Sequence, residues 1–565
     1  MNAFQWLAAL LAVTAGGPVV AGDTSPVVIQ IDAAATLGPY RTDISRRTFG
    51  SGVEFSTAQW RWTFDNLSDV GGTPVSSKTA DTIDSLSLGT LRFPNGNSSF
   101  LYIWDDPIHS YPSLPHPTQW NAYLTPAEIN RYTAADSLDM ERLFEVNTVF
   151  WLKYNPWGFQ YINKNQFSSP PLPPEIDPTN LSIAASKAAA WVASPEGATT
   201  LWWEVGNEDW SRWNASQHAD IFFEFQGKMK AARPEIKLLA QGLAADYQDN
   251  KAKAWLDALK SKLSDAGKLD SVYAYSIHQY LSAKPYEGAS LASRRKKQTQ
   301  EMLYEVDRGA EIENVKALLG TDDPHSPTRS WKIWMTEFNV FQNNAAGEFQ
   351  VLQDMGHALV MADWTGKLLE QNVERMFYHS LDTHPAFSLV QYANGTHPGG
   401  EDIEFPQVQA PGYAYSIYAQ QFGKTMVRNR IKNNRLLTTP NGKHHYGQVS
   451  TYSSISEDES SLRVMVINRD LNKSVSVNLN TMDTNPRRTL ADGKYGYRVL
   501  RSDRLTDNNH VVKDTVRWTD TAYFDQTAGG LKNVKLPPAS ANLFILPLAP
   551  RVDRAAGPSN DQASR

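Results

Sequence analysis

The sequence contains no cysteine among its 565 residues. This absence excludes disulfide bonds, thiolate metal sites, iron–sulfur clusters and cysteine nucleophiles. A strong excess of positive charge is also missing, because 54 Lys and Arg residues stand against 60 Asp and Glu residues, a formal net charge of −6. Binding to nucleic acid, which needs a basic face, is therefore not expected. Beyond residue 22 no run of about 18 consecutive apolar residues occurs, so we predict no membrane span.

The remaining composition is typical of a globular protein. Hydrophobic residues make up 41% of the chain and charged residues 20%, which is enough apolar material for a large core. The length allows roughly two to four domains, or one large barrel with an appendage. Aromatic residues reach 11%, and such flat amphipathic rings stack against sugars and bases alike.

Residues 1–22 are predicted to be a secretory signal peptide. The apolar run Leu7–Ala15 is too short to span a bilayer, and small residues follow it up to Gly22. No Lys or Arg precedes this run, so the α-amino group is the only positive charge there. The alternative is a disordered or membrane-tethering N-terminus. A signal peptide implies a secreted protein, extracellular or periplasmic, whose mature chain begins near Asp23.

Residues 48–411 alternate between short strand-like runs and longer helix-like stretches, which predicts parallel strands joined by crossover helices. The eight strand candidates are Phe49–Phe55, Thr90–Phe93, Thr148–Tyr154, Thr200–Val205, Lys237–Ala240, Ser271–Ile277, Lys332–Met335 and Arg375–His379. The helical stretches between them include Pro126–Val146, Ser182–Trp191, Ala219–Ala232, Lys251–Leu263, Glu301–Leu319 and Gln350–Glu370. Eight such units in about 330 residues predict an α/β fold, the (β/α)₈ TIM barrel.

After Gly412 the sequence changes to short β-branched or alternating runs separated by Asn, Asp, Gly and Pro. Residues 412–550 are therefore predicted to form a C-terminal all-β sandwich. Its strand candidates are Thr451–Ser453, Ser461–Ile467, Val475–Leu479, Tyr495–Leu500, Val511–Val516 and Ala541–Leu546. Residues 23–47 are expected to add a strand to this sandwich or to cross the base of the barrel. Residues 551–565 are polar and are predicted to be a disordered tail.

Two charged features are interpreted as having no role in a site. The basic run Arg294–Lys297 reads as a solvated helix start rather than a binding patch. The pair Asp322–Asp323 and the scattered His residues lack the spacing of metal ligands, so we predict no metal and no cofactor.

Functional candidates follow from the carboxyl ends of the barrel strands, because side chains there line the active sites of TIM barrels. They are Glu54, Arg92, Asn97, Asn207, Glu208, His278, Tyr280 and Glu337. A bend is expected at Gly206, which delivers the carboxylate of Glu208 to the barrel mouth. Glu337 follows the seventh predicted strand and supplies a second carboxylate. Two facing carboxylates are what cleavage of a glycosidic bond needs, and a separation of about 5–5.5 Å implies a retaining mechanism.

Several motifs resemble, in chain order, those of the family 51 glycoside hydrolases, which are α-L-arabinofuranosidases of the clan A barrels. The likeness extends from about residue 27 to about residue 548. It is carried by Asp43–Glu54, Leu91–Asn97 with Trp104, Trp203–Glu208, Ser276–Tyr280, Glu337–Val340, Val408–Pro411 and Leu536–Ser540.

The resemblance implies a role for each matching residue. Glu208 would be the acid/base and Glu337 the nucleophile, while Asn207 would hydrogen-bond the sugar 2-OH. Glu54 and Asn97 would hold sugar hydroxyls. Tyr280 would orient the nucleophile, and Arg92 would lie beneath it and keep it ionised.

Some candidates also have plainer interpretations. Arg92 could be only a buried salt-bridge partner, and His278 could be a core histidine with satisfied hydrogen bonds. Trp104 and Trp203 are candidate platforms for sugar rings, but these two residues and Trp210 could instead be packing residues.

The substrate is expected to be an oligo- or polysaccharide, and the resemblance favours α-L-arabinofuranosyl groups of plant-type polysaccharide. The chain departs from the family at Asn95, Thr336 and Phe338 and in the eighth strand, all of which border the expected sugar pocket. A clan A β-glycanase or β-glycosidase acting on xylan, glucan or algal galactan is therefore the alternative within the enzyme class. An inactive carbohydrate-binding protein on the same scaffold is the alternative from another class.

Overall fold

A computed structural model describes residues 25–36, 43–53, 77–95, 104, 139–146, 148, 176–243, 249–283, 290–342, 353–381, 388–391, 407–482, 488–509, 515–526 and 529–550. The chain divides into two compact units. The first contains residues 1–44, 421–503 and 517–565, and the second contains residues 45–420 and 504–516. The second unit thus extends past the boundary predicted near residue 412 and includes one segment from between strands of the first.

Eight parallel strands of the second unit close into a barrel, which confirms the predicted fold class. They are β2 (Phe49–Gly52), β3 (Thr90–Phe93), β4 (Glu141–Val146), β5 (Trp202–Val205), β6 (Lys237–Gln241), β7 (Val272–Ala283), β8 (Lys332–Gln342) and β9 (Arg375–Tyr378). The strands are hydrogen-bonded in chain order, and β9 closes the barrel by pairing with β2. Their carboxyl ends consequently meet at one rim, where a site can be assembled from several strands.

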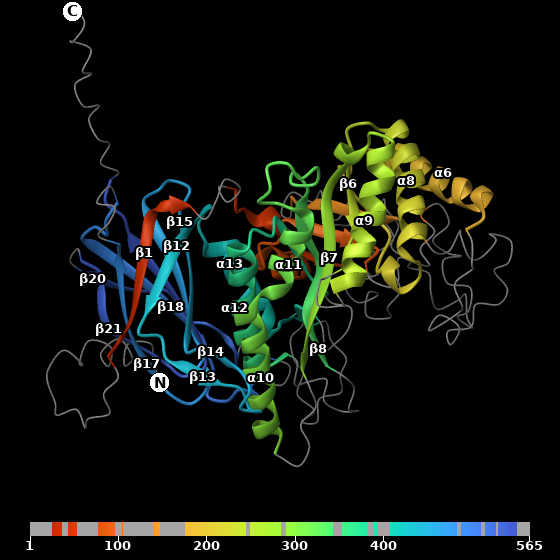
Figure 1. The fold of residues 1–565 in the computed structure, drawn as a ribbon. Helices are drawn as coiled ribbons and strands as arrows, with labels where there is room; N and C mark the ends of the chain where they lie inside the picture. The colour runs from red at the N-terminus through yellow and green to blue at the C-terminus, as the bar shows by residue number, and fades with distance from the viewer. Residues whose placement is uncertain are drawn as a thin grey trace, which may run out of the picture. The chain divides into compact units, whose positions relative to one another are not determined.

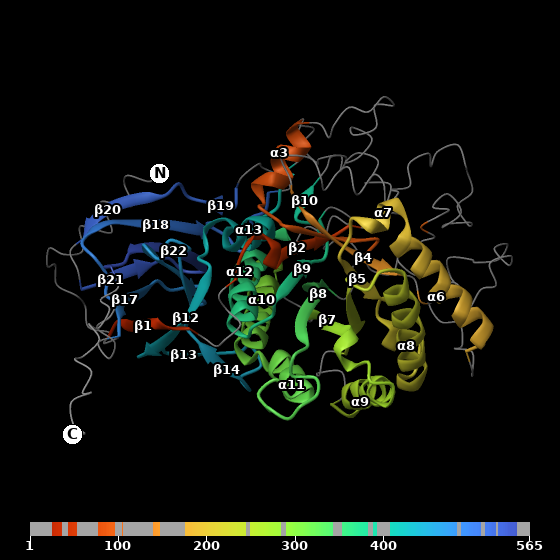
Figure 2. The same ribbon diagram turned by 90° about the horizontal axis from the view of Figure 1, so that it is seen from above.

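The helices described in this unit are α3 (Ser77–Ser85), α6 (Pro178–Ala193), α7 (Pro195–Ala198), α8 (Ala215–Ala232), α9 (Asp249–Asp265), α10 (Leu291–Arg308), α11 (Ala310–Leu319), α12 (Met355–Glu370) and α13 (Ala410–Gln421). Helices α6, α8 and α9 lie side by side outside the barrel strands (Figures 1 and 2). Asn214 and Gln217 form a capping box that starts α8. The single helix predicted over Glu301–Leu319 is broken at Gly309, whose left-handed backbone (φ 51°) ends α10 and begins α11.

The end of the predicted helix Pro126–Val146 is wrong, because Glu141–Val146 forms strand β4. Four consecutive residues of this strand are buried, as in a parallel strand that is covered on both faces. The prediction of a strand at Thr148–Tyr154 is wrong at Thr148, which lies in a bend just after β4. Residues 149–154 lie outside the described residues.

The interpretation of Arg294–Lys297 as a solvated helix start is wrong for Arg295. This side chain is fully buried and holds Asp354 in two hydrogen bonds, Nε to Oδ2 at 2.6 Å and Nη2 to Oδ1 at 2.7 Å. Asp354 also caps α12 by accepting the backbone N–H of His357. A two-bond ion pair therefore ties helix α10 to the start of helix α12.

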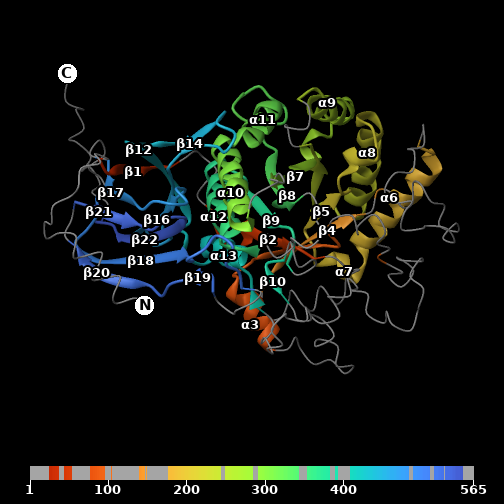
Figure 3. The same cartoon turned by 90° about the horizontal axis from the view of Figure 1, so that it is seen from below.

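The first unit is a β domain built on a ten-stranded sheet. Its strands are β1 (Val27–Thr36), β12 (Thr425–Lys432), β15 (Val449–Ile455), β16 (Ser461–Asn468), β17 (Val475–Thr481), β18 (Gly493–Arg501), β19 (Arg517–Trp518), β20 (Ala522–Gln526), β21 (Leu531–Leu536) and β22 (Ser540–Pro547). Strand β1 lies between β12 and β17, so the N-terminal segment is part of this sheet. Strands β18, β20 and β22 lie side by side in Figure 3.

Two pairs of short strands form separate two-stranded sheets. The hairpin of β13 (Leu436–Thr438) with β14 (His445–Gly447) lies apart from the ten-stranded sheet, and β10 (Val390–Gln391) pairs with β11 (Gln407–Val408) in the barrel unit. The strand predicted at Val511–Val516 is absent at residues 515 and 516, and residues 511–514 lie outside the described residues. Among the described residues, no helix is long and apolar enough to cross a membrane.

The core of the β domain predicts that alanine substitution at two aromatic positions lowers the free energy of unfolding by very different amounts. Phe544 in β22 is fully buried in this core, whereas Tyr523 in β20 is 58% exposed. We expect Phe544→Ala to lower the free energy of unfolding by about 3–5 kcal/mol, because it removes buried surface and leaves a cavity. The control Tyr523→Ala should change it by less than about 0.5 kcal/mol. Urea unfolding of both variants measures this, and equal losses would contradict the assigned core.

Candidate active site

The first candidate carboxylate, Glu208, stands on a sharp turn that follows strand β5. Gly206 has φ 88° and Glu208 has φ 43°, so the bend predicted at Gly206 is present. A Cβ atom at Gly206 would lie 2.3 Å from the Asp209 carboxylate, so the turn requires glycine there. Buried Asp209 in turn accepts hydrogen bonds from Thr148 Oγ1 at 2.7 Å and His218 Nδ1 at 3.2 Å. The turn that carries Glu208 is therefore stabilised by the buried hydrogen bonds of Asp209.

The second carboxylate, Glu337, lies at a bulge in strand β8. Met335 pairs with Ile277 and Glu337 with His278, which leaves Thr336 as the extra residue. Both Thr336 and Glu337 consequently contact groups inside the barrel: Thr336 Oγ1 donates to Glu204 at 2.8 Å, and Glu337 Oε1 accepts from Arg92 at 2.6 Å. A regular strand would have turned one of these two neighbours outward.

Arg92, from strand β3, lies at the centre of the site and is fully buried. Its Nε donates to Glu204 at 2.6 Å and its Nη1 to Glu337 at 2.6 Å. Nη2 donates to the amide oxygen of Asn207 at 3.0 Å and lies 3.2 Å from Glu145. Burial works against the charged guanidinium, but Glu145, Glu204 and Glu337 raise the pKa of Arg92 above its ordinary value. Arg92 is thus both a salt-bridge partner and a neighbour of Glu337.

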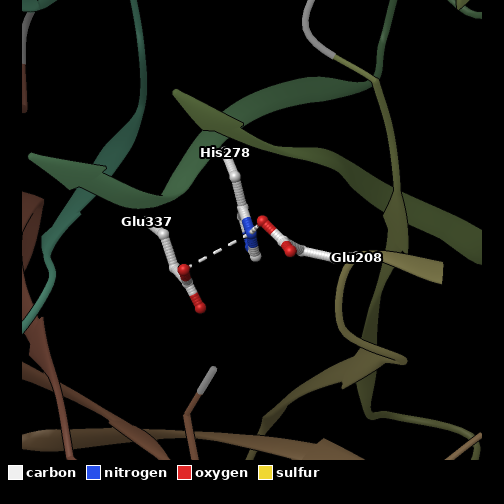
Figure 4. A group of neighbouring side chains, drawn as sticks. All are labelled: Glu208, His278 and Glu337. Carbon is white, nitrogen blue, oxygen red and sulfur yellow. Dashed lines mark hydrogen bonds and ion pairs between the residues drawn. The ribbon is translucent and has the colours of Figure 1, made fainter. Parts of the chain in front are cut away.

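The two carboxylates approach each other across the barrel mouth. The ring of His278 lies between Glu208 and Glu337, with Nδ1 at 3.3 Å from Glu208 Oε1 and 3.5 Å from Glu337 Oε2 (Figure 4). An oxygen of Glu208 and an oxygen of Glu337 lie within 4.8 Å of one another. The Glu208 side chain is 24% exposed and that of Glu337 only 4%, so solvent reaches the first more readily. The partly exposed carboxyl group of Glu208 and the buried carboxylate of Glu337 can therefore both contact the same atom group of a bound molecule.

Glu337 is held in its charged form. Burial favours the neutral acid, but His278, His379 and Arg92 hold the pKa of Glu337 well below its ordinary value, and the Tyr280 hydroxyl adds to this by donating to Oε2 at 2.6 Å. Burial and the nearby carboxylates raise the pKa of Tyr280 well above its ordinary value, so its hydroxyl stays a donor. A charged, oriented carboxylate is the form needed for nucleophilic attack.

The pKa values of the two histidines near Glu337 are shifted in opposite directions. Burial opposes protonation of His278, but Glu337 and Glu208 raise the pKa of His278 above its ordinary value. Burial lowers the pKa of His379, whose Nδ1 lies 3.1 Å from the amide nitrogen of Asn95 and 3.7 Å from Glu337. His278 therefore belongs to the polar cluster of the site, unlike a core histidine surrounded by apolar groups.

The tryptophans predicted at the site do not all lie there. Trp203 is fully buried, donates its indole N–H to Thr200 O, and packs against Phe144 and Trp191. It has no exposed face for a sugar, so its assignment to the substrate site is wrong and the packing interpretation holds. Trp104 stacks on Trp191 with ring centroids 6.1 Å apart. Glu54 and Asn97 lie outside the described residues.

Four residues of the cluster are absent from the predicted set, namely Glu145, Glu204, Gln241 and His379. Glu145 is not predicted because a helix is expected over Glu141–Val146, so no strand end is expected there. Glu204 is not predicted because it lies within a predicted strand rather than at its end. Gln241 is the last residue of β6, one position beyond the strand as predicted. The rule that strand ends carry functional residues points to Gln241 once that strand is extended by one residue, and to His379 at the end of the eighth predicted strand.

A metal ion is the other chemical use that this geometry suggests. Glu208, His278 and Glu337 offer donor atoms that all lie within 4.8 Å of one another. However, both oxygens of Glu337 are already engaged, Oε1 by Arg92 and Oε2 by Tyr280. A cation at this position would also lie close to the guanidinium of Arg92, which opposes it electrostatically. The residues present fit a metal poorly.

Comparison with solved structures identifies the fold. An α-L-arabinofuranosidase from Thermotoga maritima, solved as an arabinose complex, matches 92% of this chain and 100% of its own at 15% identity, with a TM-score of 0.63. A family 51 α-L-arabinofuranosidase from Bifidobacterium longum matches 93% of this chain and 100% of its own at 16% identity, with a TM-score of 0.65. The fold of this protein is similar to that of these family 51 α-L-arabinofuranosidases.

The structure is also similar to that of a second group of glycoside hydrolases. A family 44 xyloglucanase from Paenibacillus polymyxa matches 93% of this chain and 100% of its own at 14% identity, with a TM-score of 0.56. The sequence itself matches no protein-family model and no curated protein. The family 51-like fold is therefore established by the three-dimensional similarity rather than by the sequence.

The low pKa of Glu337 predicts how stability depends on pH. Since the carboxyl of the unfolded chain binds its proton first as pH falls, the stabilisation is full above the ordinary pKa of about 4.5 and is lost progressively below it. Between about pH 7 and pH 3 we expect the free energy of unfolding to fall more steeply in the wild type than in Glu337→Gln.

Urea unfolding at several pH values measures these slopes. Glu457→Gln is the control, because Glu457 is 79% exposed and its variant should follow the wild type. Parallel slopes for the wild type and Glu337→Gln would contradict the low pKa.

Proposed function

We propose that the protein is a retaining glycoside hydrolase with Glu208 as acid/base and Glu337 as nucleophile. The observation that carries this proposal is the approach of the two carboxylates to within 4.8 Å. Retaining enzymes hold their carboxyl groups about 5–5.5 Å apart, whereas inverting enzymes leave roughly 6.5–9.5 Å for a water molecule.

The different surroundings of the two carboxylates support this assignment of roles. Glu337 is buried, charged and oriented by Arg92 and Tyr280, as a nucleophile needs to be. In the first step Glu208 donates its proton to the leaving oxygen, while Glu337 bonds to the anomeric carbon and forms a glycosyl ester. In the second step Glu208 takes a proton from water, the water oxygen attacks the anomeric carbon, and Glu337 leaves as a carboxylate.

The sugar itself would be held by groups around this pair. Arg92 engages the amide oxygen of Asn207, which turns the amide NH₂ away from the guanidinium. That NH₂ group is proposed to donate to the sugar 2-OH, a contact that strengthens as charge develops at the anomeric carbon. Glu54 and Asn97 are proposed as further contacts of the substrate, whereas Trp104, which stacks on Trp191 and donates its indole N–H to Lys187 O in helix α6, is not among them.

We infer α-L-arabinofuranosyl groups of plant-type polysaccharide as the substrate, on the strength of the sequence motifs and of the family 51 neighbours. The second candidate is a β-glycanase that acts within a polymer. It is favoured by the similarity to a family 44 xyloglucanase. Asn95, a departure from the family 51 motifs, bonds Arg92 and His379 beside the proposed nucleophile, so this part of the site differs from the family pattern without indicating which sugar it takes. We also propose that residues 1–22 direct secretion of the enzyme.

Removal of the nucleophile tests the mechanism. We expect Glu337→Ala to reduce hydrolysis of an activated aryl glycoside to background, because no glycosyl ester can form. Added azide should restore part of the turnover by attacking the anomeric carbon in its place, giving a glycosyl azide of inverted configuration. Proton NMR of the product identifies the anomer.

Glu313→Ala is the control for this experiment, since Glu313 lies on the surface of α11 with a side chain 56% exposed. It should retain wild-type turnover without azide. Near-normal activity of Glu337→Ala would exclude Glu337 as the nucleophile.

A substrate panel separates the two candidate activities. Arabinan, arabinoxylan, xylan, xyloglucan and β-glucan are incubated with the enzyme, and the products are analysed by chromatography. An α-L-arabinofuranosidase should release free arabinose from the first two, whereas a β-glycanase should release oligosaccharides from one of the others. Turnover of a 4-nitrophenyl glycoside without either pattern would exclude both polymer assignments.

A further inference from the structure

Glu204 is a buried carboxylate that the proposed mechanism does not use. It lies in strand β5 and is fully buried. Its Oε2 accepts from Arg92 Nε at 2.6 Å, and its Oε1 accepts from Gln241 Nε2 and from Thr336 Oγ1, both at 2.8 Å. Three donors from strands β3, β6 and β8 therefore converge on one carboxylate.

On one side, Glu204 reaches the nucleophile through Arg92. A guanidinium is a planar fork, so fixing Nε also fixes the directions of the two other nitrogens. Those nitrogens hold Glu337 Oε1 at 2.6 Å and the amide oxygen of Asn207 at 3.0 Å. Thr336, the third donor to Glu204, directly precedes Glu337 in the bulge of β8.

On the other side, Glu204 reaches the acid/base through Gln241. Because Gln241 donates its Nε2 to Glu204, its Oε1 faces the other way and accepts the backbone N–H of Glu208 at 3.1 Å. Glu208 has a left-handed backbone (φ 43°, ψ 38°), which is unfavourable for a residue with a side chain and needs support from its surroundings. The Gln241 amide supplies one such anchor.

We propose that Glu204 is a positioning residue that fixes the relative positions of Glu208 and Glu337. It acts on Glu208 through Gln241 and on Glu337 through Arg92 and Thr336. This proposal rests on the proposed function. It assigns a role to a side chain that acts on each glutamate through a neighbour of that glutamate.

The chemistry of the contacts requires a carboxylate at this position. A carboxylate has two acceptor oxygens for the three donors, whereas an amide has one oxygen and would point its NH₂ at donors. In Glu204→Gln, the new NH₂ would face either Arg92 or Gln241. If Gln241 rotates to accept it, its own NH₂ then faces the Glu208 N–H, and the anchor of Glu208 is lost.

The test exchanges the two partners. We expect Glu204→Gln to lower kcat on an aryl glycoside on the order of 100-fold with little change in KM, as for a misplacement of catalytic groups by about 1 Å. The double variant Glu204→Gln/Gln241→Glu keeps the net charge. The amide introduced by the first change can accept from Arg92 Nε and donate to the carboxylate introduced by the second, which also accepts the Glu208 N–H, and the Thr336 hydroxyl can rotate to accept from the same amide. The double variant should recover most of the lost kcat, while Gln241→Glu alone, with two facing carboxylates, should not.

A second readout does not depend on activity. Hydrogen exchange of the Glu208 amide should be roughly fivefold faster in Glu204→Gln and should return toward the wild-type rate in the double variant. If the wild type hydrolyses no glycoside, the proposed function fails, and the exchange rates still decide the positioning role. If Glu204→Gln does not fold, Gln241→Met removes the Glu208 anchor without changing the charge and should show the same losses.

Three results would overturn the proposal. The first is an unchanged kcat and exchange rate in a folded Glu204→Gln. The second is a double variant that folds but recovers neither quantity. The third is an equal loss in Glu145→Gln, which removes the same charge from beside Arg92, because that would show an effect of charge alone.

Discussion

A single guanidinium group shared by buried carboxylates is the interaction on which the site depends. Glu145, Glu204 and Glu337 all lie within 3.2 Å of a nitrogen of Arg92, and none of these side chains is more than 4% exposed. Removing Arg92 would leave three buried carboxylates without their cation, and breaking even one buried ion pair in this way costs roughly 3–5 kcal/mol. A lysine, with one compact charge, could not present separate edges to the three carboxylates. The geometry of Arg92 therefore constrains every acid around it.

The barrel provides this polar cluster with a rigid apolar floor. Leu143, Trp202, Leu239, Ala274, Trp334 and Phe377 form one buried cluster inside the barrel. Two residues further along the same strands stand Glu145, Glu204, Gln241, Ser276, Thr336 and His379. Since side chains two apart on a strand point to the same face, a polar layer lies directly above an apolar one. The packing of the lower layer thus fixes the strands that carry the upper one.

This layering explains which parts of the site can be predicted from the sequence. The barrel and the pair Glu208 and Glu337 are predictable, because strands alternate with helices and both glutamates follow strand-like runs. Glu145 is missed because the last four residues of β4 are all buried, so the strand lacks the alternation that marks a half-buried strand. Trp203 is misassigned because its neighbours in the chain belong to the site while its own side chain faces outward from the strand into the helix layer. The first failure concerns the type of secondary structure and the second the direction of a side chain, and a local pattern fixes both weakly where a strand is covered on both faces.

The same layering separates what the fold requires from what the chemistry requires. A barrel of this kind needs apolar residues in its lower layer, and many combinations of apolar side chains fill such a space. The polar layer has no such freedom, because every donor in it must meet an acceptor. Thr336 illustrates this: at a bulge in β8 it donates to Glu204, while the next residue, Glu337, receives Arg92. A change at Thr336 or Gln241 would leave the apolar layer unchanged and still alter a contact of the pair Glu208 and Glu337, because Thr336 directly precedes Glu337 and Gln241 accepts the backbone N–H of Glu208.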